Sequence, residues 1–198
     1  MTKFKEIFGK IYTPKKRVDY IIYTAVILVG IFLDQLTKFF VSKYMVIGQS
    51  IPLIKGFLNF TYQTNDGAAF GMMDSPGQRW IFMTLSTVAI IAFALYLYLG
   101  NADSMISAVS LAMVISGGIG NMIDRFGLGF YVNSKGVGEV IDFIDFCGIW
   151  NAVFNGADSF VCVGAGLLIL AMTLEVIKEA KAEKAKKAAE NQANETKK

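Results

Sequence analysis

The chain has 198 residues, of which 54% are hydrophobic and only 18% are charged. This composition is more apolar than that of ordinary soluble domains and argues against a soluble fold. The net charge of +3 needs no nucleic-acid partner, because the basic residues gather at the two ends of the chain. The absence of histidine excludes serine–histidine and cysteine–histidine catalysis and the His-Glu-x-x-His zinc site.

Long apolar stretches dominate the middle of the chain. A helix of about 20 apolar residues crosses the hydrocarbon core of a membrane, which is about 30 Å thick. Open sheet edges cannot satisfy their hydrogen bonds in lipid, so the spans are expected to be helical. The first apolar stretch has no small-residue cleavage site after it and is interpreted as a retained span. The sequence predicts an all-α bundle of four transmembrane helices, at residues 20–41, 80–100, 105–123 and 150–177.

The two ends of the chain set the expected orientation. Lysine and arginine are concentrated in residues 1–19 and 178–198, and few occur in the segments between spans. Because basic residues stay in the cytoplasm, both termini are expected there, which requires an even number of spans and agrees with four. We therefore expect a multi-pass cell-membrane protein with a basic cytoplasmic N-terminal segment, a membrane domain over 20–177 and a charged cytoplasmic tail that is a fraying helix.

Two segments are then expected outside the membrane. Residues 42–79 carry β-forming residues and an Asn-Asp-Gly turn signal, which predicts a small external sheet. Residues 126–149 are glycine-rich at first and then apolar, and we expect a loop with a short surface-lying helix. "GNADS" between the second and third spans predicts a cytoplasmic hairpin. Cys147 and Cys162 are interpreted as packing residues without a disulfide.

Polar residues near the spans are functional candidates, because ionisable groups are expensive to keep in a membrane. Asp34 and Lys38 in "DQLTK" are four residues apart and can pair on one helix face. Asn65 and Gly67 lie in the predicted external turn. The third span ends in "GNMIDR", which holds three further candidates: Asn121, Asp124 and Arg125.

Two acids at the predicted outer boundary can supply hydrolytic chemistry without histidine. Asp142 lies in "VIDF", and Asp158 lies in "FNGAD" three residues after Asn155. Two neighbouring carboxylates cannot both ionise cheaply and share a proton, so one can act as a base and the other as an acid. Spacing alone leaves a proton or ion path open as the alternative, as in a proton-coupled transporter. No internal repeat of the kind found in many transporters is visible.

These motifs together resemble the lipoprotein signal peptidase family, signal peptidase II. The matching stretches are "DQLTK", "TNDGAAFG", "GNMIDR", "VIDF" and "FNGAD", and they occur in the family's order over roughly residues 20–177. The resemblance implies a four-helix membrane bundle with an external β-cradle and a short surface helix. It also implies a monomeric enzyme without metal or cofactor, whose partners are lipid-modified prolipoproteins and membrane lipid.

The resemblance also assigns roles to the candidate residues. Asp142 and Asp158 match the catalytic pair that cuts before the lipid-modified cysteine, and Asp145 is the near rival of Asp142, expected to point away on a helical turn or short loop. Residues that match positions lining the site, holding substrate or supporting the pair are Asn65, Gly67, Asn121, Arg125 and Asn155. Residues that match bracing positions are Asp34, Lys38 and Asp124.

Overall fold

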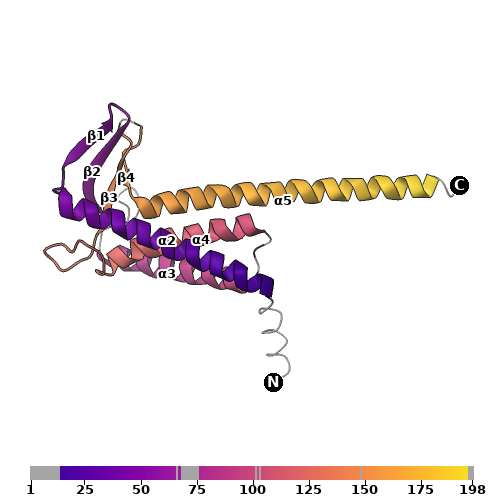
Figure 1. Ribbon diagram of the computed structural model, residues 1–198, viewed down its shortest axis with the longest axis horizontal. Coiled ribbons are helices and arrows are strands. Elements are labelled where there is room, and N and C mark those ends of the chain that lie inside the picture. The colour runs from indigo at the N-terminus through magenta and orange to yellow at the C-terminus, as the bar shows by residue number, and fades with distance from the viewer. Residues whose placement is uncertain are drawn as a thin grey trace, which may run out of the picture.

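A computed structural model describes residues 14–65, 67, 76–100, 102, 104–147 and 149–195. Figure 1 shows helices running side by side and a small sheet across one end of them. In chain order the elements are α2 (Pro14–Tyr44), β1 (Ser50–Ile54), β2 (Leu58–Asn65), α3 (Pro76–Tyr98), α4 (Met105–Arg125), β3 (Val140–Asp145), β4 (Val153–Phe154) and α5 (Gly156–Glu195). The first thirteen residues and most of the predicted turn after Asn65 lie outside the described residues.

The four long helices are those predicted from hydropathy. Each contains a window apolar and long enough to cross a membrane. In α4, 56% of that window is buried inside the protein, against 11–22% in the other three helices. The central helix is therefore α4, which packs against α2, α3 and α5, while the other helices expose apolar side chains as lipid-facing helices do.

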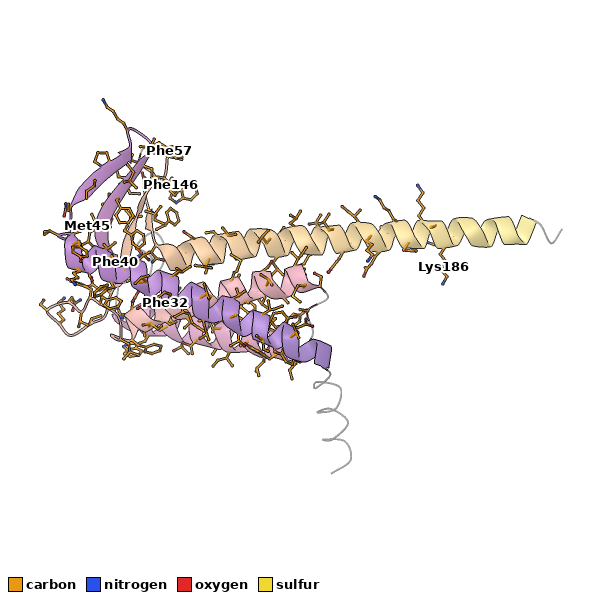
Figure 2. The ribbon with its side chains drawn as sticks, in the orientation of Figure 1. Phe32, Phe40, Met45, Phe57, Phe146 and Lys186 are labelled. Carbon is orange, nitrogen blue, oxygen red and sulfur yellow. The ribbon has the colours of Figure 1, made fainter. Side chains whose placement is uncertain are left out.

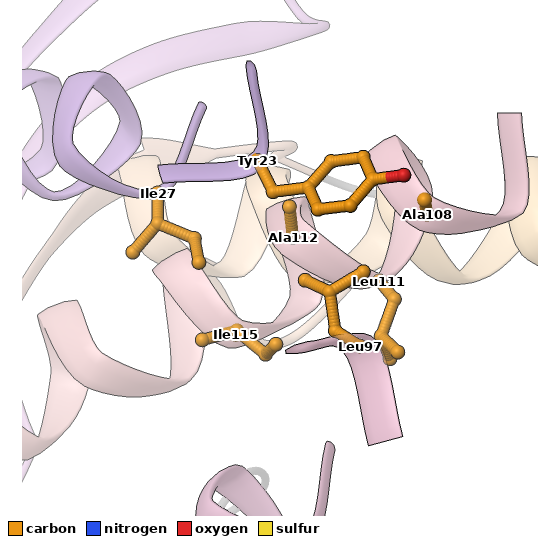
Figure 3. Close-up of a cluster of buried hydrophobic side chains, with 7 residues drawn as sticks. All are labelled: Tyr23, Ile27, Leu97, Ala108, Leu111, Ala112 and Ile115. Atoms are coloured by element: carbon orange, nitrogen blue, oxygen red, sulfur yellow. The ribbon is translucent and has the colours of Figure 1, made fainter. Parts of the chain in front are cut away.

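One half of the bundle is held by an apolar cluster that joins three helices (Figure 3). One face of α4 packs against side chains of α2 and α3. The buried residues of this cluster are Tyr23, Ile27, Leu97, Ala108, Leu111, Ala112 and Ile115. Small alanines alternate here with larger residues, so the helices approach closely. This cluster contains no charged residue, and the buried charges gather at the other end of the bundle.

Glycines allow α4 to approach its neighbours most closely near that polar end. A Cβ atom at Gly117 would collide with the backbone carbonyl of Ala157 and with the side chain of Val161 on α5. A Cβ at Gly120 would meet the Asp34 carboxylate at 2.6 Å. Small residues serve this purpose in membrane bundles, where helices associate by packing. Gly117 and Gly120 thus let α4 lie close to α5 and to α2.

The sheet has four antiparallel strands in the order β1-β2-β3-β4. One face of it packs on the end of α2 through a buried cluster of Val41, Tyr62, Ile141 and Phe143. Figure 2 shows Phe57 and Phe146 near the free end of the sheet, far from Phe32 on α2. The predicted sheet in residues 42–79 is present as β1 and β2, and two later strands complete it.

Two sequence predictions about residues 126–155 were wrong. The described residues of 126–149 contain β3 and turns but no helix, where a short surface helix was expected. Val140 to Phe143 are all buried, because both faces of β3 are covered, and the strand therefore lacks the alternation that identifies half-buried strands. The fourth long helix begins at Gly156 rather than residue 150, because β4 precedes it, and it continues as helix to Glu195 (Figure 1).

Gly117→Ala should lower the stability of the bundle, because the added methyl group pushes α5 away from α4. Overpacking of this kind costs about 1–3 kcal/mol. Gly166→Ala on α5 is the matched control, since a Cβ there meets no atom within 4 Å and alanine favours helix. Thermal unfolding of the two variants in detergent should show a lower Tm for Gly117→Ala only. Equal Tm values would contradict close α4–α5 packing.

Candidate active site

Asn155 joins the two candidate acids. Its side-chain Nδ2 donates to Oδ1 of Asp142 on β3 at 2.7 Å. Its main-chain N–H donates to Oδ2 of Asp158 on α5 at 3.0 Å. Asn155 is fully buried, with no exposed area. Asn155 therefore links the sheet to the bundle, with an acid from each side.

The start of α5 fixes the position of Asp158. Asn155 lies just before the helix, and its Oδ1 accepts the main-chain N–H of Asp158 at 2.9 Å. Asp158 in turn accepts the main-chain N–H of Asn155, so the two residues cap the helix reciprocally, like a capping box. The free N–H groups at a helix start also favour a negative charge there. The "NGAD" stretch thus folds locally into a rigid holder for one carboxylate.

Amide groups from two other elements complete the surroundings of the acids. Asn65 at the end of β2 donates from Nδ2 to Oδ2 of Asp142 at 3.2 Å. Asn121 on α4 donates from Nδ2 to Oδ1 of Asp158 at 2.8 Å. Each of the four carboxylate oxygens therefore accepts one N–H group from the protein. These donors support negative charge at the site without neutralising it.

The electrostatics of Asp142 favour a retained proton. Only 4% of the residue is exposed. Burial, and secondly the charge of Asp158, raise the pKa of Asp142 to about 7, although hydrogen bonds from Asn65 and Asn155 oppose the shift. The two acids titrate as a coupled pair. Near neutral pH, such a pair can hold one proton and one negative charge.

Arg125 supports the end of β2, where Asn65 lies. Its Nη2 donates to the carbonyl oxygen of Gly67 at 2.8 Å, and the Gly67 N–H donates to Oδ1 of Asn65 at 3.0 Å. Its guanidinium also lies over the ring of Phe82, 5.0 Å from the ring centroid. The chain of contacts runs from α3 and α4 to the end of β2, so Arg125 holds the Asn65 amide toward Asp142.

A buried ionic cluster lies beside the two acids. Lys38 Nζ is 2.8 Å from Oδ2 of Asp34 and 2.6 Å from Oδ2 of Asp124, and all three residues are at most 1% exposed. The other oxygen of Asp34 accepts the main-chain N–H of Ala157 at 2.7 Å. The predicted Asp34–Lys38 pair is confirmed, and Asp124 joins it from α4. The cluster thus ties α2 to α4 and to the start of α5.

A cavity of about 560 Å³ opens beside the acids between α3, α4 and α5. Its polar groups lie in one region and include Asn65, Asn121, Arg125, Asp142, Asn155 and Asp158. The rest of its wall is mostly apolar and includes Phe82, Ile90, Phe93, Trp150, Phe154 and Val161. A ligand that matches this lining has an apolar segment that ends at a polar, reactive group.

Asp145 does not join the site. It is on β3, as Asp142 is, but its Oδ2 accepts a hydrogen bond from Thr61 Oγ1 at 2.9 Å. It pairs with Asn59 in the sheet and does not line the cavity. The expected direction away from the acids therefore results from a strand, and the expected helical turn or short loop was wrong.

Gln35 and the apolar wall were missed from the sequence. Gln35 Nε2 lies 3.1 Å from Oδ1 of Asp124 and 3.2 Å from Oδ2 of Asp34, and so adds a neutral donor to the ionic cluster. Its position directly after Asp34 was the available signal. Side chains such as Phe82 carry no comparable signal, because any apolar residue of a span can face lipid or cavity. Within the described ranges, no group of three His, Cys, Asp or Glu side chains could hold a metal ion.

Known proteins are similar to this chain in sequence and in fold. The family model described as Signal peptidase (SPase) II matches residues 26–174. A lipoprotein signal peptidase of Halalkalibacterium halodurans is 40% identical over 169 residues, which cover 84% of this chain and 99% of that protein. One from Halothermothrix orenii is 42% identical over 145 residues, covering 73% and 90%.

A solved structure described as a bacterial membrane enzyme, determined by the in meso method at 2.3 Å resolution, superimposes with a TM-score of 0.65. It is 29% identical in sequence, and the match covers 78% of this chain and 88% of that one. Sequence and fold agree with the resemblance carried by the five motifs. The chain therefore belongs to the signal peptidase II family, the lipoprotein signal peptidases.

Proposed function

We propose that Asp142 and Asp158 form the aspartic dyad with which this signal peptidase cuts lipid-modified prolipoproteins on the amino side of the modified cysteine. The observation that carries the proposal is the double contact of Asn155, which holds one acid by its side chain and the other by its main chain. Their coupling supports the sharing of one proton, which hydrolysis by two carboxylates requires.

The reaction then needs only water and the two acids. The ionised carboxylate takes a proton from a water molecule, whose oxygen attacks the scissile carbonyl carbon. The protonated carboxyl donates a hydrogen bond to the developing oxyanion and stabilises it. When the carbon–nitrogen bond breaks, a carboxyl proton passes to the leaving amine, and the dyad again holds one proton. Asn65, Asn121 and Asn155 keep both carboxylates in place through these steps.

The shape of the cavity supports this substrate class. A lipoprotein precursor has an apolar signal segment before its cysteine, and the apolar wall between α3, α4 and α5 can receive that segment. The scissile bond then lies at the polar group of Asp142, Asp158 and Arg125. The acyl chains can remain in lipid, because the helices around the cavity expose apolar surface to it.

The basic ends of the chain support an orientation with both termini in the cytoplasm. The sheet is at the opposite end of the bundle from the α3–α4 hairpin (Figure 1), and the two acids of the dyad lie on β3 and in the first turn of α5. We infer that the dyad works near the outer membrane face, under the sheet, which serves as the external cradle. Asp34, Lys38 and Asp124 brace the helices below it.

Asp142→Asn and Asp158→Asn should each abolish most cleavage, because asparagine keeps the shape of the side chain but cannot carry the shared proton. The loss should be roughly 10⁴-fold or more for each, and the double variant should be little worse than either. Asp145→Asn is the matched control, since Asp145 lies on the same strand outside the cavity, and its activity should stay close to normal. Single-turnover cleavage of a purified lipidated precursor measures these effects. Near-normal cleavage by a folded Asp142→Asn would contradict the dyad.

The dyad should also give the enzyme a pH dependence that Asp142 sets. Since the pKa of Asp142 is about 7, the single-turnover cleavage rate should fall as the pH rises above about 7 and the shared proton is lost.

The folded protein binds this proton more tightly than an unfolded chain, whose aspartate pKa is about 3.9. The stability that binding of this proton contributes is thus present below about pH 4 and is lost as the pH rises to about 7. Melting curves should show Asp142→Asn gaining stability relative to the parent between pH 5 and 8.

Cysteine labelling should report the proposed orientation. In a background without Cys147 and Cys162, a membrane-impermeant thiol reagent added outside should label Lys135→Cys, on the exposed loop before β3. It should label Ala102→Cys, in the α3–α4 hairpin, and Lys187→Cys, on the extended part of α5, only after the membrane is permeabilised. Labelling of Lys187→Cys in intact cells would contradict the proposed orientation.

A further inference from the structure

Lys38 is a buried cation that the proposed chemistry does not use. Its ammonium group has no exposed area and meets three acceptors. Two are the carboxylates of Asp34 and Asp124, at 2.8 and 2.6 Å. The third is Oδ1 of Asn121, at 3.0 Å, and this contact reaches toward the dyad.

The contact with Asn121 determines which way that amide points. An amide has a donor end and an acceptor end, whereas a lysine ammonium can only donate. Oδ1 of Asn121 must therefore face Lys38, and it also accepts Nδ2 of Asn155 at 3.0 Å. The donor end is thereby directed to Asp158, where Nδ2 lies 2.8 Å from Oδ1. The reversed amide would place donor against donor at Lys38 and oxygen against oxygen at Asp158.

The same constraint extends to the second acid. Because Asn121 offers an oxygen to Asn155, one N–H of the Asn155 amide is used there and the other points to Asp142. The Asn155 oxygen faces the main-chain N–H of Asp158 instead. The orientations of the Asn121 and Asn155 amides thus both agree with a Lys38 ammonium group that can only donate.

We infer that Lys38 is a positioning residue of this protease: its ammonium group locks the Asn121 amide with the N–H side toward Asp158. The inference rests on the proposed dyad and adds a function to a residue otherwise assigned to bracing. Asp34 and Asp124 keep the ammonium charged and in place. Lys38 touches neither acid of the dyad within ion-pair distance. Its charge lowers the pKa of Asp142 through space, and its hydrogen bond toward the dyad goes to Asn121.

A pure brace and a positioning residue predict different outcomes when the ion pairs are removed without changing net charge. Lys38→Met/Asp124→Asn removes one positive and one negative group together. It leaves one buried carboxylate without a cation, that of Asp34, whereas Lys38→Met alone would leave two, which is more strongly destabilising. Asp34 still accepts N–H groups of Gln35 and Ala157. The other charged groups around the dyad stay in place: Asp34 on α2, Arg79 on α3 and Arg125 on α4.

The compensated variant should retain substrate KM but lose about 10- to 100-fold in kcat, the scale of a lost hydrogen bond to a charged group. The acidic limb of its kcat–pH profile should move to higher pH, because the ionised dyad loses a fixed donor. A brace moves the melting temperature but not this profile. A compensated variant with parental kcat and pH profile would overturn the inference, while inactive dyad variants would leave the proposed function standing.

A double-mutant cycle tests the route through Asn121. In an Asn121→Leu background the compensated change should lower kcat by less than threefold, since the amide it positions is gone. Full additivity of the two effects would contradict the route. Asp124→Asn alone is the charge control, and it remains measurable if the compensated variant does not fold, because it keeps Lys38 beside Asn121. Its melting temperature should fall while its pH profile stays parental, and a displaced profile would refute positioning by Lys38.

Discussion

Four carboxylates at one end of an apolar bundle, three of them buried and that of Asp158 partly buried, are the constraint around which this structure is organised. An isolated carboxylate in such surroundings is costly unless it has donors or takes up a proton. Asp34 and Asp124 share a full positive charge, that of Lys38. Asp142 and Asp158 receive only neutral N–H groups. The ammonium therefore offsets one of the two negative charges of the first pair, whereas the second pair has only neutral donors and is relieved when it shares a proton.

The fold is arranged to deliver those donors. Asn155 lies between β4 and α5, so the sheet and the bundle cannot separate without breaking the contacts to both acids. Gly120 lets α4 approach the Asp34 carboxylate, which also accepts the main-chain N–H of Ala157 in the first turn of α5. The close packing of the helices thus also places N–H donors around the Asp34 carboxylate. The sheet is part of the site as much as the helices are.

The sequence predicted what depends on local composition and failed where partners are distant. Hydropathy identified the four spans, and four-residue spacing identified the Asp34–Lys38 pair, because both signals are local. That Asp124 joins this pair depends on how two helices are rotated against each other, and spacing carries no such information. The dyad's members were named through family motifs, since spacing alone left a proton path open. Strand β3 was missed because burial on both faces removes its alternation.

The two acids come from different kinds of element, and this asymmetry has a chemical use. Asp158 is in the first turn of a helix, where a main-chain N–H and the positive end of the helix dipole favour a negative charge. Asp142 is on a covered strand and is held only by side-chain amides, and its pKa of about 7 favours a proton. Different surroundings thus distinguish two chemically identical groups, as the proposed acid–base pair requires. A symmetric pair of helix-borne acids in the same bundle would lack this bias, so the covered strand contributes to the proposed chemistry as well as to the architecture.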